Sequence, residues 1–176
     1  RPEFTINLSL IEGENTTFAV LAIPCEDTLY IALKEGMPLK YEIKTQQWLI
    51  YSKQDDDSKI KIGLSQSSQK KPKYDQYLQA MSELTEYSEF KAGSAYKFCM
   101  ILEDKVDIYP RFHPTSEWDT SSGQGLLESI GGGLVSLNAI PFTYNQRETV
   151  LNDGFIAFRD KDNEKLALDA LTNVRL

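Results

Sequence analysis

Asp119 has the clearest capacity for chemistry in this sequence. It lies in the stretch PTSEWDTSSGQG, residues 114–125, where a helix is predicted to begin. The free N–H groups and the macrodipole of a helix N-terminus attract phosphate, and a carboxylate there can hold a divalent cation against that phosphate. We expect the small residues 121–123 to leave this helix mouth open for a ligand. The alternative is an ordinary helix cap formed by Ser116 or Asp119.

Two other segments hold groups that could bind a phosphorylated ligand. Gly93 and Ser94 separate a predicted strand from a predicted helix, and Lys97 follows one turn later. Arg111 ends a predicted strand, where a guanidinium can bind phosphate through two parallel hydrogen bonds. Each feature has a structural alternative, because Gly-Ser turns, solvated lysines and surface ion pairs are common.

The histidine and cysteine content argues against several other chemistries. His113 is the only histidine, which leaves no basis for a His-rich metal site or a Ser-His-Asp triad, and we interpret it as structural. Cys25 and Cys99 are the only cysteines. Two isolated cysteines predict reduced thiols rather than a disulfide or a metal pair.

The length and charge of the chain narrow the class of protein. Its 176 residues are enough for one sizeable core, and its net charge of −7 argues against a nucleic-acid-binding groove. It contains no apolar run long enough to span a membrane. Together with the reduced cysteines and the lack of a signal peptide, this predicts a cytoplasmic protein. Peripheral attachment to the inner face of the cell membrane stays open.

The elements that must position these residues fall into two groups. Short segments rich in β-branched and aromatic residues predict antiparallel strands over residues 4–12, 17–25, 28–34, 40–44, 47–52 and 59–65. Apolar spacing after residue 73 predicts helices at about 74–84, 95–103, 116–130 and 163–173. Strands are expected between them at 89–93, 106–111, 134–137 and 154–158. This alternation predicts a mostly parallel sheet with helices on its faces, so the fold class is α/β (α+β).

Taken together, these segments resemble one family. GSAYKFCMILEDKVDIYPRFHPTSEWDTSSGQGLLESIGG is similar to the C-terminal region of CysQ-type 3′(2′),5′-bisphosphate nucleotidases, which belong to the inositol monophosphatase superfamily. The family pattern there is GSSxKFC, then ADxYPR, then PTxxWDTAAG. PEFTINLSLIEG, AIPCEDTLYIALKEG and VLNDGFIAF match further family segments, so the resemblance covers essentially the whole chain.

This resemblance implies a site and a reaction. Asp119 matches the family's C-terminal metal-ligating aspartate, which also lies close to the substrate phosphate. Ser94, Lys97 and Arg111 match positions that contact the nucleotide, and Ser68 stands where the family has a substrate-contacting histidine. The implied reaction is Mg²⁺-dependent, Li⁺-sensitive hydrolysis of 3′-phosphoadenosine 5′-phosphate to AMP and phosphate. The expected partner is therefore a small nucleotide bisphosphate rather than a nucleic acid.

The resemblance also implies the layered sugar-phosphatase fold and a division of the chain. Residues 1–66 would be antiparallel strands completing an N-terminal metal-binding domain, and residues 67–176 an α/β domain with the nucleotide pocket. The family's DPxDGT motif, which supplies most of its metal-binding carboxylates, does not occur in this sequence. We therefore expect the C-terminal part of a longer enzyme, inactive alone, whose open apolar face dimerises or binds the missing part. An inositol monophosphatase-like enzyme and a non-catalytic nucleotide- or anion-binding module are the alternatives.

Overall fold

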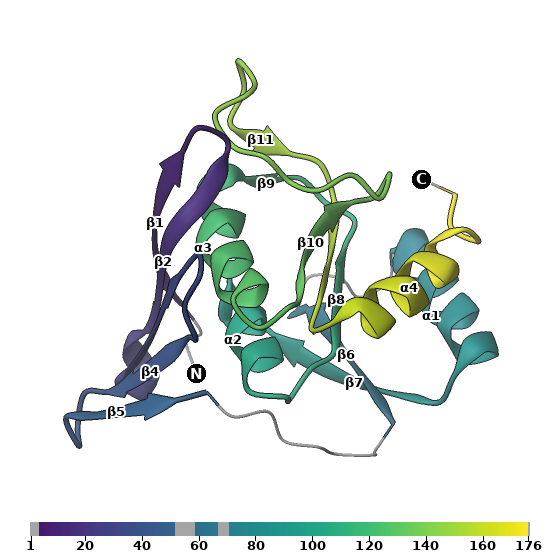
Figure 1. The fold of residues 1–176 in the computed structure, drawn as a ribbon. Coiled ribbons are helices and arrows are strands. Elements are labelled where there is room, and N and C mark those ends of the chain that lie inside the picture. The colour runs from purple at the N-terminus through teal and green to yellow at the C-terminus, as the bar shows by residue number, and fades with distance from the viewer. Residues whose placement is uncertain (1–3, 52–58, 67–70, 176) are drawn as a thin grey trace.

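Sheets and helix pairs alternate in four layers (Figure 1). The computed structural model describes residues 4–51, 59–66 and 71–175. Helices α2 (Tyr96–Leu102) and α3 (Glu117–Glu128) lie between two five-stranded sheets. Helices α1 (Pro72–Leu84) and α4 (Lys161–Leu171) cover the far face of the second sheet. This arrangement confirms the layered, mixed α/β fold expected from the sequence.

The first sheet is an antiparallel meander, as the hairpin pattern predicted. Its strands follow chain order: β1 (Ile6–Glu12), β2 (Asn15–Ile23), β3 (Thr28–Leu33), β4 (Leu39–Glu42) and β5 (Gln47–Ile50), with a 3₁₀ turn η1 (Pro24–Glu26) after β2. Side chains on one face alternate inward, so that Ala19, Leu21 and Tyr30 pack with α2 and α3 in a core between the sheets.

The opposite face of the first sheet is apolar, and nothing in the described ranges covers it. The pairing register aligns its side chains in three rows, Ile6–Ala22–Leu29, Leu8–Val20–Ile31 and Leu10–Phe18–Leu33. We call these rows the outer apolar face. The side chains of Ile6, Leu8 and Leu33 are exposed by 58%, 60% and 59%. Contiguous exposed apolar surface of this kind marks an interaction site.

The second sheet is mixed, so the prediction of a mostly parallel sheet was wrong. Its order is β10 (Gly133–Ser136), β12 (Phe155–Phe158), β8 (Ile108–Arg111), β6 (Ile60–Ser65) and β7 (Tyr87–Ala92). β6 is parallel to β7 and β8, but β12 runs antiparallel to both of its neighbours. The α3 crossover does connect two strands of the same direction, β8 and β10. The later strand β12 inserts between them in the opposite direction, which strand–helix alternation alone does not predict.

The expected grouping of β6 with the antiparallel strands was also wrong. β6 pairs in parallel with β7 over its whole length, from Ile60↔Tyr87 to Ser65↔Ala92. Helix α1 is the crossover between these two strands, because parallel neighbours need such a connection. The change from first to second sheet therefore falls between β5 and β6 rather than after residue 66. The roles expected of the two parts stay predictions.

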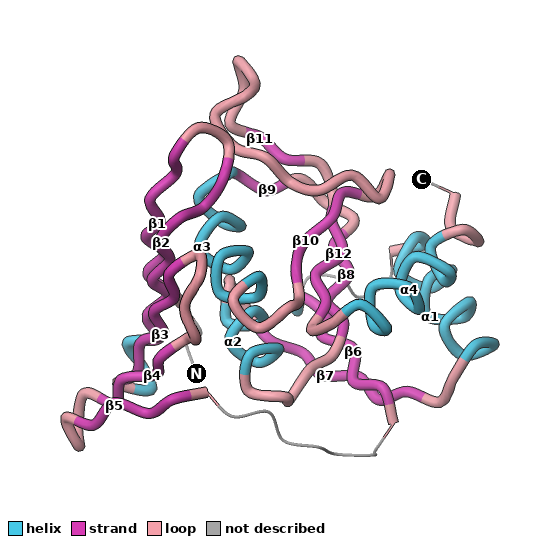
Figure 2. The backbone as a smooth tube through the Cα atoms, in the orientation of Figure 1, coloured by secondary structure: helices cyan, strands magenta, loops and turns pink. Residues whose placement is uncertain are grey.

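Two short strands hold the segment that leads into α3. β9 (Thr115–Ser116) pairs antiparallel with β11 (Leu151–Asn152), and Figure 2 shows β9 running directly into α3. A second core fills the space between the second sheet and helices α1 and α4, with Tyr77, Met81 and Ile156 fully buried. Within the described residues, no helix has the length and apolar character needed to cross a membrane.

Candidate functional site

A pocket of about 330 Å³ lies where three parallel strands end. Ser65 is the last residue of β6, Gly93 follows the end of β7, and Arg111 is the last residue of β8. Ser94 and Asp119 complete this part of the lining from the N-terminal regions of α2 and α3. In α/β sheets, ligands bind beyond the carboxyl ends of parallel strands. We call this cavity the Asp119 pocket, and it brings together Ser94, Arg111 and Asp119 as the sequence predicted.

Asp119 serves both as a helix cap and as part of the pocket lining. Its carboxylate oxygen Oδ2 accepts a hydrogen bond of 3.0 Å from the main-chain N–H of Ser116, the N-cap of α3. The side chain is exposed, and its other oxygen has no hydrogen bond to the part of the chain that the structure describes. The two alternatives for Asp119 are therefore compatible, since capping uses one oxygen and leaves the other for a ligand.

The small residues after Asp119 do not leave the helix mouth open, so that expectation was wrong. Ser121 and Ser122 are 5% and 0% exposed. A Cβ at Gly123 would collide with the ring of Phe98 on α2, and one at Gly125 would meet Thr16 and Ala19 of β2 at 2.7 and 2.9 Å. α3 is packed against α2 on one side and the first sheet on the other, and only small residues permit that approach.

Arg111 and Thr115 bring buried donors to the same pocket. Nη1 of Arg111 donates to the hydroxyl of Tyr109 at 3.2 Å. Nε of Arg111 and Oγ1 of Thr115 are both buried and have no hydrogen-bond partner among the described residues. Thr115 lines the pocket but was missed by the sequence reasoning. The available signal was its hydroxyl, placed midway between Arg111 and Asp119 in the same segment.

Ser94 occupies a strained position at the mouth of the pocket. Its φ of 49° is left-handed, a conformation that costs a residue other than glycine about 1–2 kcal/mol. Its hydroxyl lies 2.7 Å from the hydroxyl of Thr5, just before β1. Strained residues of this kind cluster at functional sites and persist where the surrounding structure holds them.

Lys97 is not where a direct nucleotide contact would require it. Its side chain is 0% exposed and does not line the pocket. The ammonium donates to the carbonyls of Ala92 and Ser94 at 2.8 and 3.0 Å, and it lies 4.6 Å from the centre of the Tyr109 ring. The ammonium of Lys97 therefore holds the turn that presents Ser94, and the nucleotide contact expected of Lys97 stays a prediction.

Ser68, predicted to replace the family histidine, lies outside the described residues. His113 has a structural environment, as interpreted from the sequence. Its Nε2 is 2.7 Å from the ammonium of Lys71, and its ring lies 5.6 Å from that of Tyr74. Burial, followed by the charges of Lys71 and Arg111, lowers the pKa of His113. Cys25 and Cys99 are free thiols, the first exposed and the second buried.

The residues present do not by themselves fit a magnesium centre. Among the described residues that line its pocket, Asp119 is the only carboxylate. No cluster of three or more His, Cys, Asp or Glu that could hold a metal ion occurs within residues 4–51, 59–66 and 71–175. Mg²⁺ demands near-octahedral oxygen coordination, and Asp119 offers one ligand toward it. A complete metal site needs further ligands.

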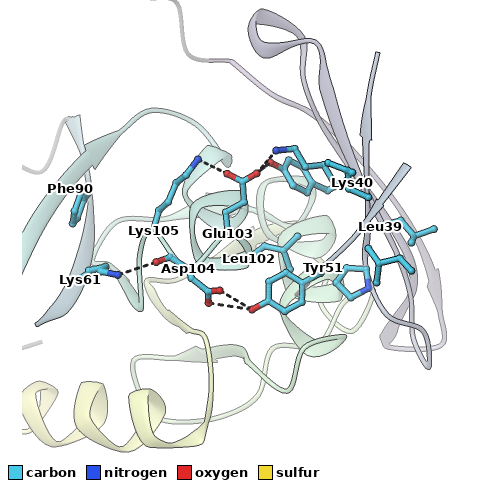
Figure 3. Close-up of a pocket in the computed structure, with 13 residues that line it drawn as sticks. Leu39, Lys40, Tyr51, Lys61, Phe90, Leu102, Glu103, Asp104 and Lys105 are labelled. Carbon is cyan, nitrogen blue, oxygen red and sulfur yellow. Dashed lines mark hydrogen bonds and ion pairs between the residues drawn. The ribbon is translucent and has the colours of Figure 1, made fainter. Parts of the chain in front are cut away.

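A second cavity of about 610 Å³ lies at the opposite end of α2 (Figure 3). The carboxylate of Glu103 accepts hydrogen bonds from Tyr30 and Lys40 of the first sheet and from Lys105. Burial opposes the ionised form, but these three donors outweigh it and lower the pKa of Glu103. The neighbouring Asp104 accepts from Tyr51 at 3.2 Å. We call this the Glu103 cavity.

The comparison with known proteins assigns the chain to a family. Residues 1–175 match the model of the inositol monophosphatase family. The chain belongs to the inositol monophosphatase family. This membership confirms the resemblance read from the sequence.

Two curated relatives of this family member are longer than the chain. It is 31% identical to the 3′(2′),5′-bisphosphate nucleotidase CysQ of Escherichia coli (strain K12) over 153 residues, which cover 87% of the chain and 59% of the relative. It is 29% identical over 165 residues to CysQ of Buchnera aphidicola subsp. Acyrthosiphon pisum, covering 88% and 57%. The chain thus spans less than two thirds of the length of either relative.

Solved structures share the fold. The crystal structure of CysQ from Bacteroides thetaiotaomicron superposes with a TM-score of 0.81 and 24% identity, covering 90% of this chain and 64% of that one. Inositol monophosphatase II from Staphylococcus aureus MSSA476 superposes with a TM-score of 0.75 and 16% identity, covering 96% and 62%. At these identities the match concerns the arrangement of the layers.

Proposed function

We propose that this chain forms the substrate-binding part of a Mg²⁺-dependent 3′(2′),5′-bisphosphate nucleotidase. The proposed reaction is the hydrolysis of 3′-phosphoadenosine 5′-phosphate to AMP and phosphate. The observation that carries the proposal is the convergence of Ser94, Arg111 and Asp119, from three separate elements, on one pocket. It is supported by family membership and by the activity named for the CysQ relatives.

The pocket contains one positive and one negative side chain, a combination that suits a phosphate held next to a cation. Arg111 offers a guanidinium, whose charge-assisted hydrogen bonds to phosphate oxygens are strong and directional. Asp119 places a carboxylate in the same 330 Å³. A carboxylate beside a phosphate dianion is repulsive unless a cation lies between them. The pocket is therefore proposed to bind phosphate on the Arg111 side and to lend one oxygen of Asp119 to a metal.

Hydrolysis needs ligands and a bound water that the described residues do not supply. We therefore expect the 176-residue chain alone to bind the bisphosphate but not to turn it over. The test measures phosphate release from 3′-phosphoadenosine 5′-phosphate with Mg²⁺, for this chain and for the natural gene product that contains it. The gene product should be active and inhibited by Li⁺. Robust turnover by the isolated chain would refute the proposal that this chain binds the substrate but lacks the residues needed for hydrolysis.

Parallel assays separate the other candidate functions. Faster hydrolysis of inositol monophosphate than of the bisphosphate by the gene product would favour the inositol monophosphatase alternative. Tight binding of the bisphosphate without Mg²⁺, combined with no hydrolysis by either protein, would favour a non-catalytic binding module.

The outer apolar face is proposed to be covered in the working protein. The cover would be a second copy of this chain or additional chain of the kind that the longer relatives contain. β1 lies at the edge of the first sheet, so a partner can meet both an apolar face and unpaired main-chain groups. Light scattering on the isolated chain should show a dimer or larger species. A monomer at about 100 µM would contradict self-association, since apolar interfaces of standard size bind more tightly than this.

A further inference from the structure

Thr115 is a buried threonine whose hydroxyl has nothing to bind. Its side chain is 6% exposed, and Oγ1 has no partner within the part of the chain that the structure describes. The main chain of Thr115 is held by the pairing of β9 with β11, where it lies opposite Asn152. Valine would serve that strand equally well without burying an unpaired hydroxyl, which is unfavourable. Packing alone therefore does not explain a threonine here.

The second unpaired donor lines the same pocket. Nε of Arg111 is buried and without a partner among the described residues, although Nη1 of the same guanidinium is bound to the Tyr109 hydroxyl. Arg111 and Thr115 both line the Asp119 pocket. The Tyr109 contact fixes the guanidinium before any ligand arrives, so that less side-chain freedom is lost on binding. Two residues that line one cavity therefore each carry an unpartnered donor, and one of them also carries a fixed positive charge.

The chemistry of these groups selects an oxyanion. The guanidinium Nε can only donate, and the threonine hydroxyl can donate to an acceptor that carries negative charge. The carboxylate of Asp119 repels an anion from its own side of the pocket. An anion in this cavity is thereby directed toward the guanidinium of Arg111. A tetrahedral phosphate offers several oxygens and can accept from both groups at once.

We propose that Thr115 is a ligand-binding residue, whose hydroxyl donates to a phosphate oxygen of the substrate while Nε of Arg111 donates to the same phosphate group. The assignment rests on the proposed function for its ligand, and it adds a residue that the family resemblance did not supply. The predicted signature is unusual. Removal of the hydroxyl weakens phosphate binding but does not weaken the fold, because the hydroxyl makes no hydrogen bond in the unliganded protein.

The test compares Thr115→Val with Thr115→Ser and with a matched control at Thr28. Thr28 is also 6% exposed, but its hydroxyl donates to the carbonyl of Glu26 at 3.0 Å. Inorganic phosphate is the probe, titrated into the isolated chain without Mg²⁺ by calorimetry or NMR. Thermal unfolding of each unliganded variant is measured alongside.

Thr115→Val should weaken phosphate binding about tenfold, equivalent to about 1.4 kcal/mol, with a Tm equal to or above that of the wild type. Thr115→Ser should retain binding, since it keeps the hydroxyl. Thr28→Val should lower the Tm and leave phosphate binding unchanged. Unchanged phosphate affinity of Thr115→Val, or a Tm drop in that variant matching that of Thr28→Val, would overturn the assignment.

Failure of the inference is distinguishable from failure of the proposed function. Phosphate binding by the isolated chain involves neither a metal nor hydrolysis, so it tests Thr115 by itself. If wild-type chain does not bind phosphate at millimolar concentration, the inference is overturned whatever the gene product hydrolyses. If binding depends on the Thr115 hydroxyl and the gene product hydrolyses no bisphosphate nucleotide, the proposed function fails and the anion-binding role stands.

Discussion

The Glu103 cavity has almost twice the volume of the Asp119 pocket, about 610 against 330 Å³, but the two treat their polar groups differently. In the Glu103 cavity the charged groups satisfy one another, and within the described residues none of its lining side chains has a buried, unpaired polar atom. Two residues that line the smaller pocket, Arg111 and Thr115, each carry a buried donor with no partner among the described residues. In this molecule, buried polar groups without hydrogen-bond partners therefore indicate a ligand site better than cavity volume does.

The pairing around Glu103 also explains what the larger cavity does. Tyr30 and Lys40 belong to the first sheet, whereas Glu103 and Lys105 follow α2 and lead into the second sheet. The carboxylate therefore joins the two halves of the fold. The polar residues of the Glu103 cavity therefore form a structural contact between the two sheets. The Asp119 pocket is the candidate functional site.

The largest expected effect is on catalysis and concerns Asp119. In the natural gene product, Asp119→Asn should lower the rate of bisphosphate hydrolysis by at least about 100-fold, since changes around metal ligands cost this much or more. The fold should be little affected, because the asparagine side-chain oxygen can still accept from the N–H of Ser116. Phosphate release and urea unfolding measure the two quantities. Near-normal turnover by this variant would show that Asp119 does not bind the metal. The Asp119 pocket would then no longer differ from the Glu103 cavity as a candidate site.

The opposite pattern is expected at Glu103. Glu103→Gln should lower the free energy of unfolding by about 2 kcal/mol at pH 7, because a charged acceptor of three hydrogen bonds is replaced by a weaker one. Phosphate binding in the Asp119 pocket should not change. If Glu103→Gln weakened phosphate binding as much as it weakened the fold, the two cavities would be coupled rather than separate.

The pH dependence follows from the lowered pKa of Glu103. A carboxyl whose pKa is lower in the folded than in the unfolded state stabilises the fold above its ordinary value, here 4.5, and loses that contribution as the pH falls through the folded value. The stability difference between wild type and Glu103→Gln should therefore be full at pH 6–7 and shrink below about pH 4.5. Urea titrations across this range check it, and a difference that grows in acid would contradict the assigned hydrogen bonds.

Much of the fold and of the Asp119 pocket could be predicted from the sequence, for local reasons. Alternating strands, turn clusters and apolar helical spacing depend on near neighbours, so the hairpins and helices lie close to the predicted ranges. The convergence of Ser94, Arg111 and Asp119 came from the family motifs in which those residues stand. These are the features that short stretches of sequence encode.

The remaining features depend on contacts between distant segments. Lys97 looked like a nucleotide contact, but the carbonyls of Ala92 and Ser94 take its ammonium into the interior. The direction of β12 depends on its insertion between β8 and β10, which both precede it in the sequence. Thr115 was missed because its importance is a lack of partners, which no single sequence displays.

The smallest expected effect concerns Tyr51, at the edge of the Glu103 cavity. Its hydroxyl donates to Asp104 over 3.2 Å, and Asp104 also pairs with Arg159 at 3.0 Å. Because Arg159 remains, Tyr51→Phe should cost only about 0.5–1 kcal/mol of unfolding free energy. Burial and the Asp104 carboxylate raise the pKa of Tyr51 to about 12, so the hydroxyl stays a donor throughout pH 6–9 and the cost should be constant there. Urea unfolding at both ends of that range checks the constancy. A change in phosphate affinity in this variant would show that a polar group of the Glu103 cavity affects the Asp119 pocket. The hydrogen bonds and ion pairs within the Glu103 cavity argue against such an effect.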